Sequence, residues 1–207
     1  MLKTARSNPA RGLTLVELVV GLAVMTTLLM TAAPNLSTWT HNSGIRLAAE
    51  SMVSGLQFAK AEAVTRNARV RFQLTTTLDN NCALSSTGRN WVANLDPDAD
   101  AGALTGHCGD AASDTTAPRI LKYRAAAEGS GAAVVSTDAP GASLVFNGLG
   151  RLWPQPGDNL AIDITDPAGG NCAAAGGEMT CLRIVITPTG LVRLCNPNLS
   201  ADNPQGC

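Results

Sequence analysis

The sequence has few aromatic residues and only two histidines. Phe, Trp and Tyr make up 3 % of the 207 residues, so a folded core has to be built mainly from Val, Leu, Ile and Ala. Neither His41 nor His107 has a recognisable nucleophile nearby in the sequence, and there is no G-x-S-x-G elbow, phosphate-binding loop or H-E-x-x-H motif. We therefore expect no catalytic residue, no enzyme activity and no cofactor.

Charge is also scarce over a long stretch near the start. Residues 1–12 contain Lys3, Arg6 and Arg11 and no acid, whereas Leu13 to Ala33 contain a single charge, Glu17. A helix of about 20 apolar residues crosses the roughly 30 Å hydrocarbon core of a bilayer. Because flanking cations tend to stay in the cytoplasm, this pattern predicts one transmembrane helix over residues 13–34 with the remainder of the chain outside.

An ordinary secretory signal is the alternative interpretation of this segment. Such a signal would be removed after the apolar run, where Ala32 and Ala33 form a weak cleavage pattern. The run of 21 residues is long for the apolar region of a signal, so we prefer the retained helix.

Cysteine is missing from the first 80 residues. All six cysteines lie in the part expected outside the membrane, which indicates disulfides in an oxidising compartment. Six cysteines allow 15 connectivities, and we favour neighbours in sequence because each pair would close a loop with little strand content. The favoured pairs are Cys82 with Cys108, Cys172 with Cys181 and Cys195 with Cys207. There is no C-x-x-C pair, so a metal bound by cysteine is not expected.

The segment 35–66 has helical periodicity. Apolar or small residues recur at spacings of three and four, which places them on one face of an amphipathic helix: Ile45, Ala49, Met52, Leu56, Ala59 and Ala63. Short apolar segments follow from residue 67 to the end, separated by Gly, Pro and Asn, and they indicate antiparallel strands. We predict an α+β fold in which the long N-terminal helix packs on a small antiparallel β-sandwich.

The stretch "RGLTLVEL" resembles the leader of type IV pilins and pseudopilins. The resemblance implies that residues 1–12 are a leader, that a prepilin peptidase cuts between Gly12 and Leu13, and that Leu13 is then N-methylated. It also implies that Glu17 docks onto the N-terminal amine of a neighbouring subunit during assembly, and that Pro34 kinks the helix.

Two later stretches are similar to the GspH/FimT family of minor pilins and pseudopilins. These are "QFAKAEAVTRNARV" at residues 57–70 and "LVFNGLGRL" at residues 144–152. Region 80–140 matches no motif and is interpreted as variable loop and edge strand. The resemblance implies a pilin-like fold, with other pilins, the peptidase and the inner-membrane assembly platform as partners.

Two binding hypotheses remain weaker alternatives. Alternating acids at Asp96, Asp98 and Asp100 partly resemble a calcium loop, but His107 stands where that loop needs its last acid. Some proteins of the family bind DNA through a Gly-Arg-x-Arg motif, and the matching stretch here runs from Gly190 to Arg193 with the first Arg replaced by Leu. Arg183 and Arg193 are the only cations beyond residue 151, and phosphate binding needs several.

The combined interpretation is a minor pilin of the inner membrane with its β-rich domain, residues 67–207, in the periplasm. It would prime assembly of a type IV pilus or sit at the tip of the filament. The alternative is the pseudopilin GspH of a type II secretion system, and a DNA-binding pilin is the weaker third possibility.

Overall fold

The structure, a computed structural model, describes residues 14–96, 104–125 and 133–207, without the side chains of residues 31–35 and 125. The chain divides into two compact units, Met1–Ser37 and Thr38–Cys207. Helix α1 (Leu15–Arg66) begins in the first unit and ends in the second, in agreement with the predicted helix from residue 13 to residue 66. Over the described residues, no helix combines the length and the apolarity needed to cross a membrane.

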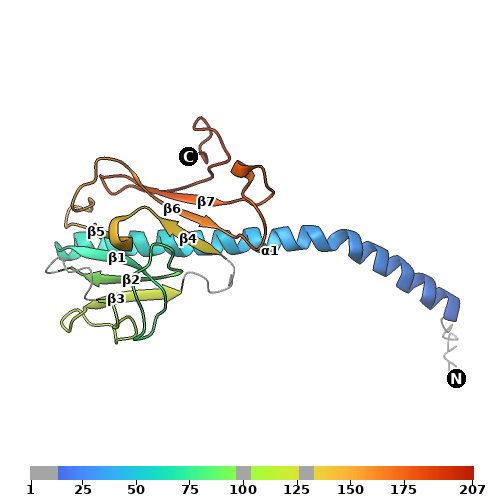
Figure 1. The fold of residues 1–207 in the computed structure, drawn as a ribbon, viewed down its shortest axis with the longest axis horizontal. Coiled ribbons are helices and arrows are strands. Elements are labelled where there is room, and N and C mark those ends of the chain that lie inside the picture. The colour runs from blue at the N-terminus through green and yellow to red at the C-terminus, as the bar shows by residue number, and fades with distance from the viewer. Residues whose placement is uncertain (1–13, 97–103, 126–132) are drawn as a thin grey trace, which may run out of the picture. The chain divides into compact units, whose positions relative to one another are not determined.

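The second unit contains two four-stranded antiparallel sheets (Figure 1). Sheet A has the order β3–β2–β1–β5, and sheet B has the order β4–β6–β7–β8. The strands of sheet A are β1 (Val70–Thr75), β2 (Asn90–Leu95), β3 (Ile120–Ala125) and β5 (Ser143–Phe146). Those of sheet B are β4 (Val134–Thr137), β6 (Leu160–Thr165), β7 (Leu182–Ile186) and β8 (Val192–Cys195). Two short 3₁₀ helices, η2 (Pro140–Ala142) and η3 (Ala173–Ala175), lie in the connections.

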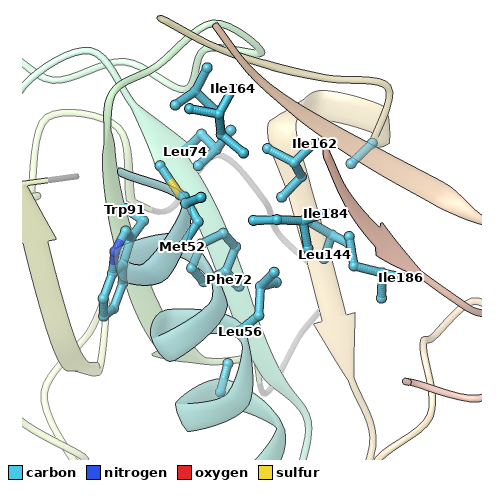
Figure 2. Packing of buried hydrophobic residues seen from close by; sticks show 14 of the residues in the cluster. Met52, Leu56, Phe72, Leu74, Trp91, Leu144, Ile162, Ile164, Ile184 and Ile186 are labelled. Carbon is cyan, nitrogen blue, oxygen red and sulfur yellow. The ribbon is translucent and has the colours of Figure 1, made fainter. Parts of the chain in front are cut away.

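The C-terminal half of α1 shares one core with both sheets. All six residues of the predicted apolar face, from Ile45 to Ala63, have no exposed surface. In Figure 2, Met52 and Leu56 of the helix lie beside Phe72 of β1, with Ile162 and Ile184 of sheet B nearby. The predicted α+β fold, with a helix packed on antiparallel sheets, is therefore confirmed.

Strand β2 was not predicted, because region 80–140 was interpreted as variable loop and edge strand. In the structure β2 lies inside sheet A, between β1 and β3, and its Trp91 is 1 % exposed. The sequence of β2, NWVANL, has asparagine at Asn90 and Asn94. Asparagine is depleted in strands, and it is tolerated here because Nδ2 of Asn94 donates a hydrogen bond to the carbonyl of Pro118.

A second small core covers the opposite face of sheet A. All six residues of β1 are buried, including Arg71 and Gln73. The connections on either side of β2 supply the cover: their Cys82, Leu104 and Cys108 form a separate apolar cluster with Val92 of β2 and Ile120 of β3.

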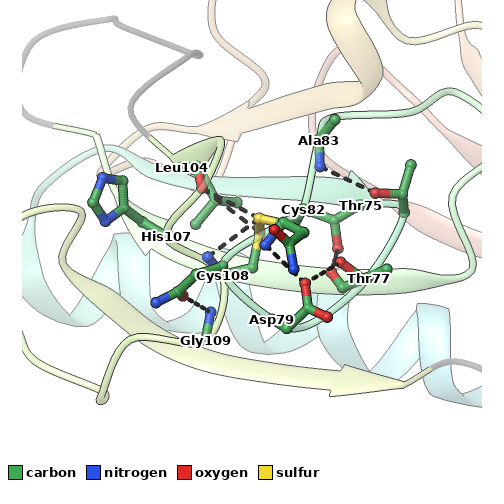
Figure 3. Close-up of a disulfide and its surroundings, with 12 residues drawn as sticks. Thr75, Thr77, Asp79, Cys82, Ala83, Leu104, His107, Cys108 and Gly109 are labelled. Atoms are coloured by element: carbon green, nitrogen blue, oxygen red, sulfur yellow. Dashed lines mark hydrogen bonds between the residues drawn. A yellow bond between two sulfur atoms is a disulfide. The ribbon is translucent and has the colours of Figure 1, made fainter.

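Three disulfides close the loops, and they join the pairs favoured from the sequence. Cys82 bonds Cys108, Cys172 bonds Cys181, and Cys195 bonds Cys207. Figure 3 shows the first bridge, where the N–H of Cys108 donates to the sulfur of Cys82 and the buried Leu104 lies alongside. This bridge lies within the second core, so it holds an apolar cluster as well as a loop.

Gly55 lies where α1 passes close to two aromatic rings. A Cβ on this residue would come within 2.7 Å of Trp91 and 2.8 Å of Phe72. Alanine gains about 1 kcal/mol over glycine in a helix, but overpacking a filled core costs about 1–3 kcal/mol. We expect Gly55→Ala to lower the midpoint of thermal unfolding of the C-terminal unit, measured by near-ultraviolet circular dichroism.

The matched control is Gly21→Ala, since Gly21 is also helical and a Cβ there meets nothing within 4 Å. That variant should leave the midpoint unchanged. A Gly55→Ala protein as stable as the wild type would contradict the close packing of α1 on these rings.

The bridge between Cys82 and Cys108 should stabilise the fold more than the bridge between Cys195 and Cys207. It spans 26 residues instead of 12, and its sulfurs lie inside an apolar cluster. Chain-entropy arguments give roughly 3–4 kcal/mol for loops of this order. The double variant Cys82→Ser with Cys108→Ser should lose about that much free energy of unfolding in urea. The variant with Cys195→Ser and Cys207→Ser should lose less, and the reverse ranking would contradict this assignment.

Candidate functional site

The predicted assembly site lies at the start of α1. Gly12 and Leu13, the predicted cleavage and methylation residues, lie outside the described residues. Thr14 precedes the first helical residue, and its hydroxyl accepts a hydrogen bond from the N–H of Glu17 at 3.2 Å. A Thr followed three residues later by a Glu, with this bond, is the arrangement of a helix capping box. This bond uses the backbone N–H of Glu17, so the capping side chain is that of Thr14, and a bond from the Glu17 carboxylate back to the N–H of Thr14 would complete the box. The T-x-x-E spacing was visible in the sequence, but the sequence analysis did not use it.

Glu17 is the only acid in an exposed apolar segment. It is exposed in the first turn of α1, and the large apolar side chains that follow it up to Met30 are all more than half exposed. A carboxylate at this position also interacts favourably with the positive end of the helix dipole. The predicted kink at Pro34 remains a prediction, because the structure does not describe the side chain of Pro34.

The two arginines proposed to bind DNA are both bound within the protein. Arg183 donates two hydrogen bonds to the carboxylate of Asp163 on the neighbouring strand, at 2.6 and 3.0 Å. This hydrogen bonding raises the pKa of the Arg183 guanidinium further above its usual value. Arg193 donates to the backbone carbonyl of Gly206 at 3.0 Å. With one cation neutralised and the other held by the C-terminal loop, the pair offers little to a phosphate backbone.

The glycine of the proposed DNA-binding motif has a packing role instead. Gly190 has φ of 81° in the β7–β8 turn, and a Cβ there would clash with the carbonyl oxygen of Gly150. The ammonium of Lys60 donates to the carbonyl of Gly190 at 2.8 Å, which ties this turn to α1. The glycine is therefore explained by the close approach of two turns.

Asp96, the first acid of the proposed calcium loop, faces into the protein. Its side chain is 1 % exposed and forms ion pairs with the guanidinium groups of Arg71 and, at 3.5 Å, Arg69. Asp98 and Asp100 lie outside the described residues. Within the described ranges no group of three or more His, Cys, Asp or Glu residues is placed to hold a metal.

The two histidines pair with carboxylates rather than with a nucleophile. Nδ1 of His41 lies 2.7 Å from the carboxylate of Asp166, which is 1 % exposed, and His107 lies 3.0 Å from Asp110. Next to His41 on α1, Asn42 accepts a hydrogen bond from the N–H of Thr180 at 2.8 Å. The Asn42 contact fixes the loop closed by Cys172 and Cys181 to α1, and the His41 contact fixes the residue after β6 to the same helix. No sequence pattern indicated either contact.

Comparison with known proteins agrees with this arrangement. Residues 48–190 match the family described as Type II transport protein GspH. No curated protein sequence matches the chain. The match begins at residue 48, well after residues 1–12, which are expected to form a leader, so the N-terminal motif and the family match are independent observations.

The fold is similar to that of a solved minor pilin. One crystal form of the type IV minor pilin FimU from Pseudomonas aeruginosa PAO1 has a TM-score of 0.51, with 16 % identity over 82 % of this chain and 98 % of that chain. A second form of FimU gives 0.45, with 17 % identity over 77 % and 97 %. At this identity the likeness concerns the fold alone.

The family match extends over more than half of the chain. Pilin-type family and fold together indicate a structural, non-catalytic protein. The chain belongs to the GspH family and is a pilin-like subunit of the minor pilin or pseudopilin type.

Proposed function

We propose that this chain is a minor pilin that is built into a type IV pilus, where it primes assembly or sits at the tip. Prepilin peptidase cuts between Gly12 and Leu13, and the new N-terminus is methylated. Residues 13–34 hold the subunit in the inner membrane with its C-terminal domain in the periplasm, until the assembly platform passes it to other pilins in the filament.

The observation that carries this proposal is the helix start at Thr14 and Glu17. A cut after Gly12 leaves one residue, Leu13, before the residue that caps the helix. The new amine is then a cation at the positive end of a helix dipole, which is an unfavourable position. A carboxylate from a neighbouring subunit would relieve this, and each subunit carries one such carboxylate in Glu17.

The type II secretion pseudopilus is the alternative machine. The description of the matched family favours it. Three disulfides favour the pilus, because a subunit exposed at a filament tip gains most from crosslinks. Both machines use the same processing and the same docking chemistry. A test that distinguishes them therefore has to measure both surface pili and secreted protein.

Processing is tested by mass spectrometry of the chain purified from membranes of the native host. We expect a mature polypeptide that starts at Leu13 and carries one N-terminal methyl group. In a strain without prepilin peptidase the leader should stay attached. A mature chain whose first residue lies beyond Ala33 would show that the apolar segment is removed, and the filament proposal would then be wrong.

The docking role of Glu17 can be separated from its capping role by two substitutions. Gln at this position of a capping box can replace Glu, so Glu17→Gln keeps the helix start and removes the charge. Glu17→Ala removes both. If Glu17 pairs with a neighbouring amine, both variants should be processed normally, and both should reduce incorporation into filaments by at least about tenfold, as expected for losing a partly buried ion pair.

The readouts are surface pili by electron microscopy and secreted protein in the culture supernatant. A loss of pili with secretion intact supports the pilus, and the opposite result supports the pseudopilus. If Glu17→Gln assembles like the wild type and Glu17→Ala does not, the charge of Glu17 is not needed and only a capping role remains. That result would contradict the docking proposal.

A further inference from the structure

A cleft of about 440 Å³ opens in the C-terminal unit beside the first turns of α1 that belong to that unit. This volume lies within the range of pockets that bind small molecules. Besides α1, the start of β7, the end of β8 and the loops next to them form its walls. No motif in the sequence marked this place. The polar and aromatic side chains that line it include Trp39, Asn42, Ser43, Arg46, Asn196 and Gln205.

The cleft offers hydrogen-bond donors and no acid. Among the described residues that line it there is no Asp or Glu, and Arg46 is the cation. The amide oxygen of Asn42 accepts a hydrogen bond from the N–H of Thr180 at 2.8 Å. The amide oxygen of Asn196 accepts one from the N–H of Asn198 at 2.9 Å. An amide whose oxygen is used inside the protein leaves its NH2 group, which only donates, for a ligand. The lining therefore fits a ligand that is rich in acceptor oxygens.

Arg46 brings a positive charge that can change its partner. Its Nε lies 3.0 Å from the carboxylate of Glu50 on the same helix, and the two side chains are 76 % and 54 % exposed. Exposed pairs between residues four apart on a helix contribute little stability. An anionic oxygen in the cleft can therefore compete with Glu50 for the guanidinium, whose parallel N–H groups match the oxygens of a phosphate.

Trp39 is the lining residue that follows the exposed apolar segment in the sequence. Its side chain is 65 % exposed, and that of Leu36 before it is 61 % exposed. Arg46 is the first Lys, Arg, Asp or Glu after Glu17. Tryptophan, with an apolar ring and one N–H donor, is enriched at the level of the lipid headgroups. Trp39 therefore has the chemistry of a residue at the boundary between lipid and water.

The length of the apolar segment predicts the same boundary. This step rests on the proposed function, in which residues 13–34 hold the subunit in the inner membrane. The hydrocarbon core is about 30 Å thick and takes about 20 helical residues. Counted from Glu17, whose charge stays at the cytoplasmic surface, about 20 residues reach Ser37. The periplasmic headgroup layer then begins near Trp39.

We propose that the cleft binds the headgroup of an anionic phospholipid of the phosphatidylglycerol type. The phosphate accepts hydrogen bonds from Arg46 and from the amide groups of Asn42 and Asn196, and the ring of Trp39 lies against the glycerol backbone of the lipid. Phosphatidylcholine fits less well, because its quaternary ammonium is repelled by Arg46 and forms no hydrogen bond with the amides. A bound lipid holds the C-terminal unit at the membrane surface until the subunit enters a filament.

The three tryptophans allow a test with internal controls. The full chain is labelled with 5-fluorotryptophan and placed in phosphatidylcholine nanodiscs, in which phosphatidylglycerol replaces an increasing fraction of the lipid. The three fluorine resonances are assigned with Trp39→Phe and Trp153→Phe. The Trp39 resonance should shift saturably with the phosphatidylglycerol fraction. The resonances of the buried Trp91 and of Trp153, which does not line the cleft, should stay unchanged.

Three charge variants separate the cleft from a general effect of surface charge. Arg46→Gln should raise the phosphatidylglycerol fraction at half-maximal shift about fivefold, as expected for removing one cation next to an anionic lipid surface. Glu50→Gln should lower that fraction, because Arg46 loses the acid that competes with the lipid. Arg66→Gln, the matched control at the other end of α1, removes the same charge outside the cleft and should change nothing.

Asn196→Asp tests the amide donor without breaking the loop. A carboxylate still accepts the hydrogen bond from the N–H of Asn198, so the midpoint of thermal unfolding should stay the same. The substitution replaces a donor with a negative charge, so it should weaken the phosphatidylglycerol response at least as much as Arg46→Gln does. A wild-type response in Asn196→Asp would contradict the proposed binding mode.

The remaining outcomes separate this inference from the proposed function. A Trp39 resonance that ignores phosphatidylglycerol, or equal responses of Arg46→Gln and Arg66→Gln, would refute the lipid site alone. A saturable shift in pure phosphatidylcholine discs with up to about 10 mM glycerol phosphate would show a soluble ligand instead of a lipid. A full chain that does not enter nanodiscs at all would refute the membrane segment of the proposed function, and this inference with it.

Discussion

Burial of one face of α1 is the constraint on which the C-terminal unit depends. Six small or apolar residues between Ile45 and Ala63 lose all exposed surface against two sheets that share no strand. Small residues are essential along this face, because the rings of Trp91 and Phe72 leave no room for a methyl group at Gly55. The helix therefore joins the two sheets into one core, and a sequence with only 3 % aromatic residues can fill it.

Periodicity predicted the parts of the fold that bury one face. The helical face was predicted residue by residue, and the short apolar segments after residue 67, which include β6, β7 and β8, were predicted as antiparallel strands. β2 was not predicted, because it is covered on both faces and its sequence NWVANL, with asparagine at Asn90 and Asn94, has no clear period. Its position depends on a loop that folds back over sheet A, and such a tertiary contact leaves no local signal.

The candidate site was predictable in chemistry but not in geometry. The leader pattern singled out Glu17, and the capping bond to Thr14 follows from the same residues once the helix start is known. Asp96 was misplaced by pattern alone: three alternating acids looked like cation ligands, whereas Asp96 lies buried against Arg71. A sequence does not show which acid has an arginine next to it on a neighbouring strand, and that partner decides the role of the acid.

Internal pairing of arginines has a wider consequence for recognition. Arg66 is bound by Glu62 and Asp114, which raises the pKa of the Arg66 guanidinium, and Arg183 is bound by Asp163. Exposed pairs of this kind contribute little stability, but they remove free positive charge from the surface. Arginines that are paired in this way add little to any long-range attraction for DNA or anionic surfaces. Specific binding near them then has to come from shape, apolar contact and backbone hydrogen bonds.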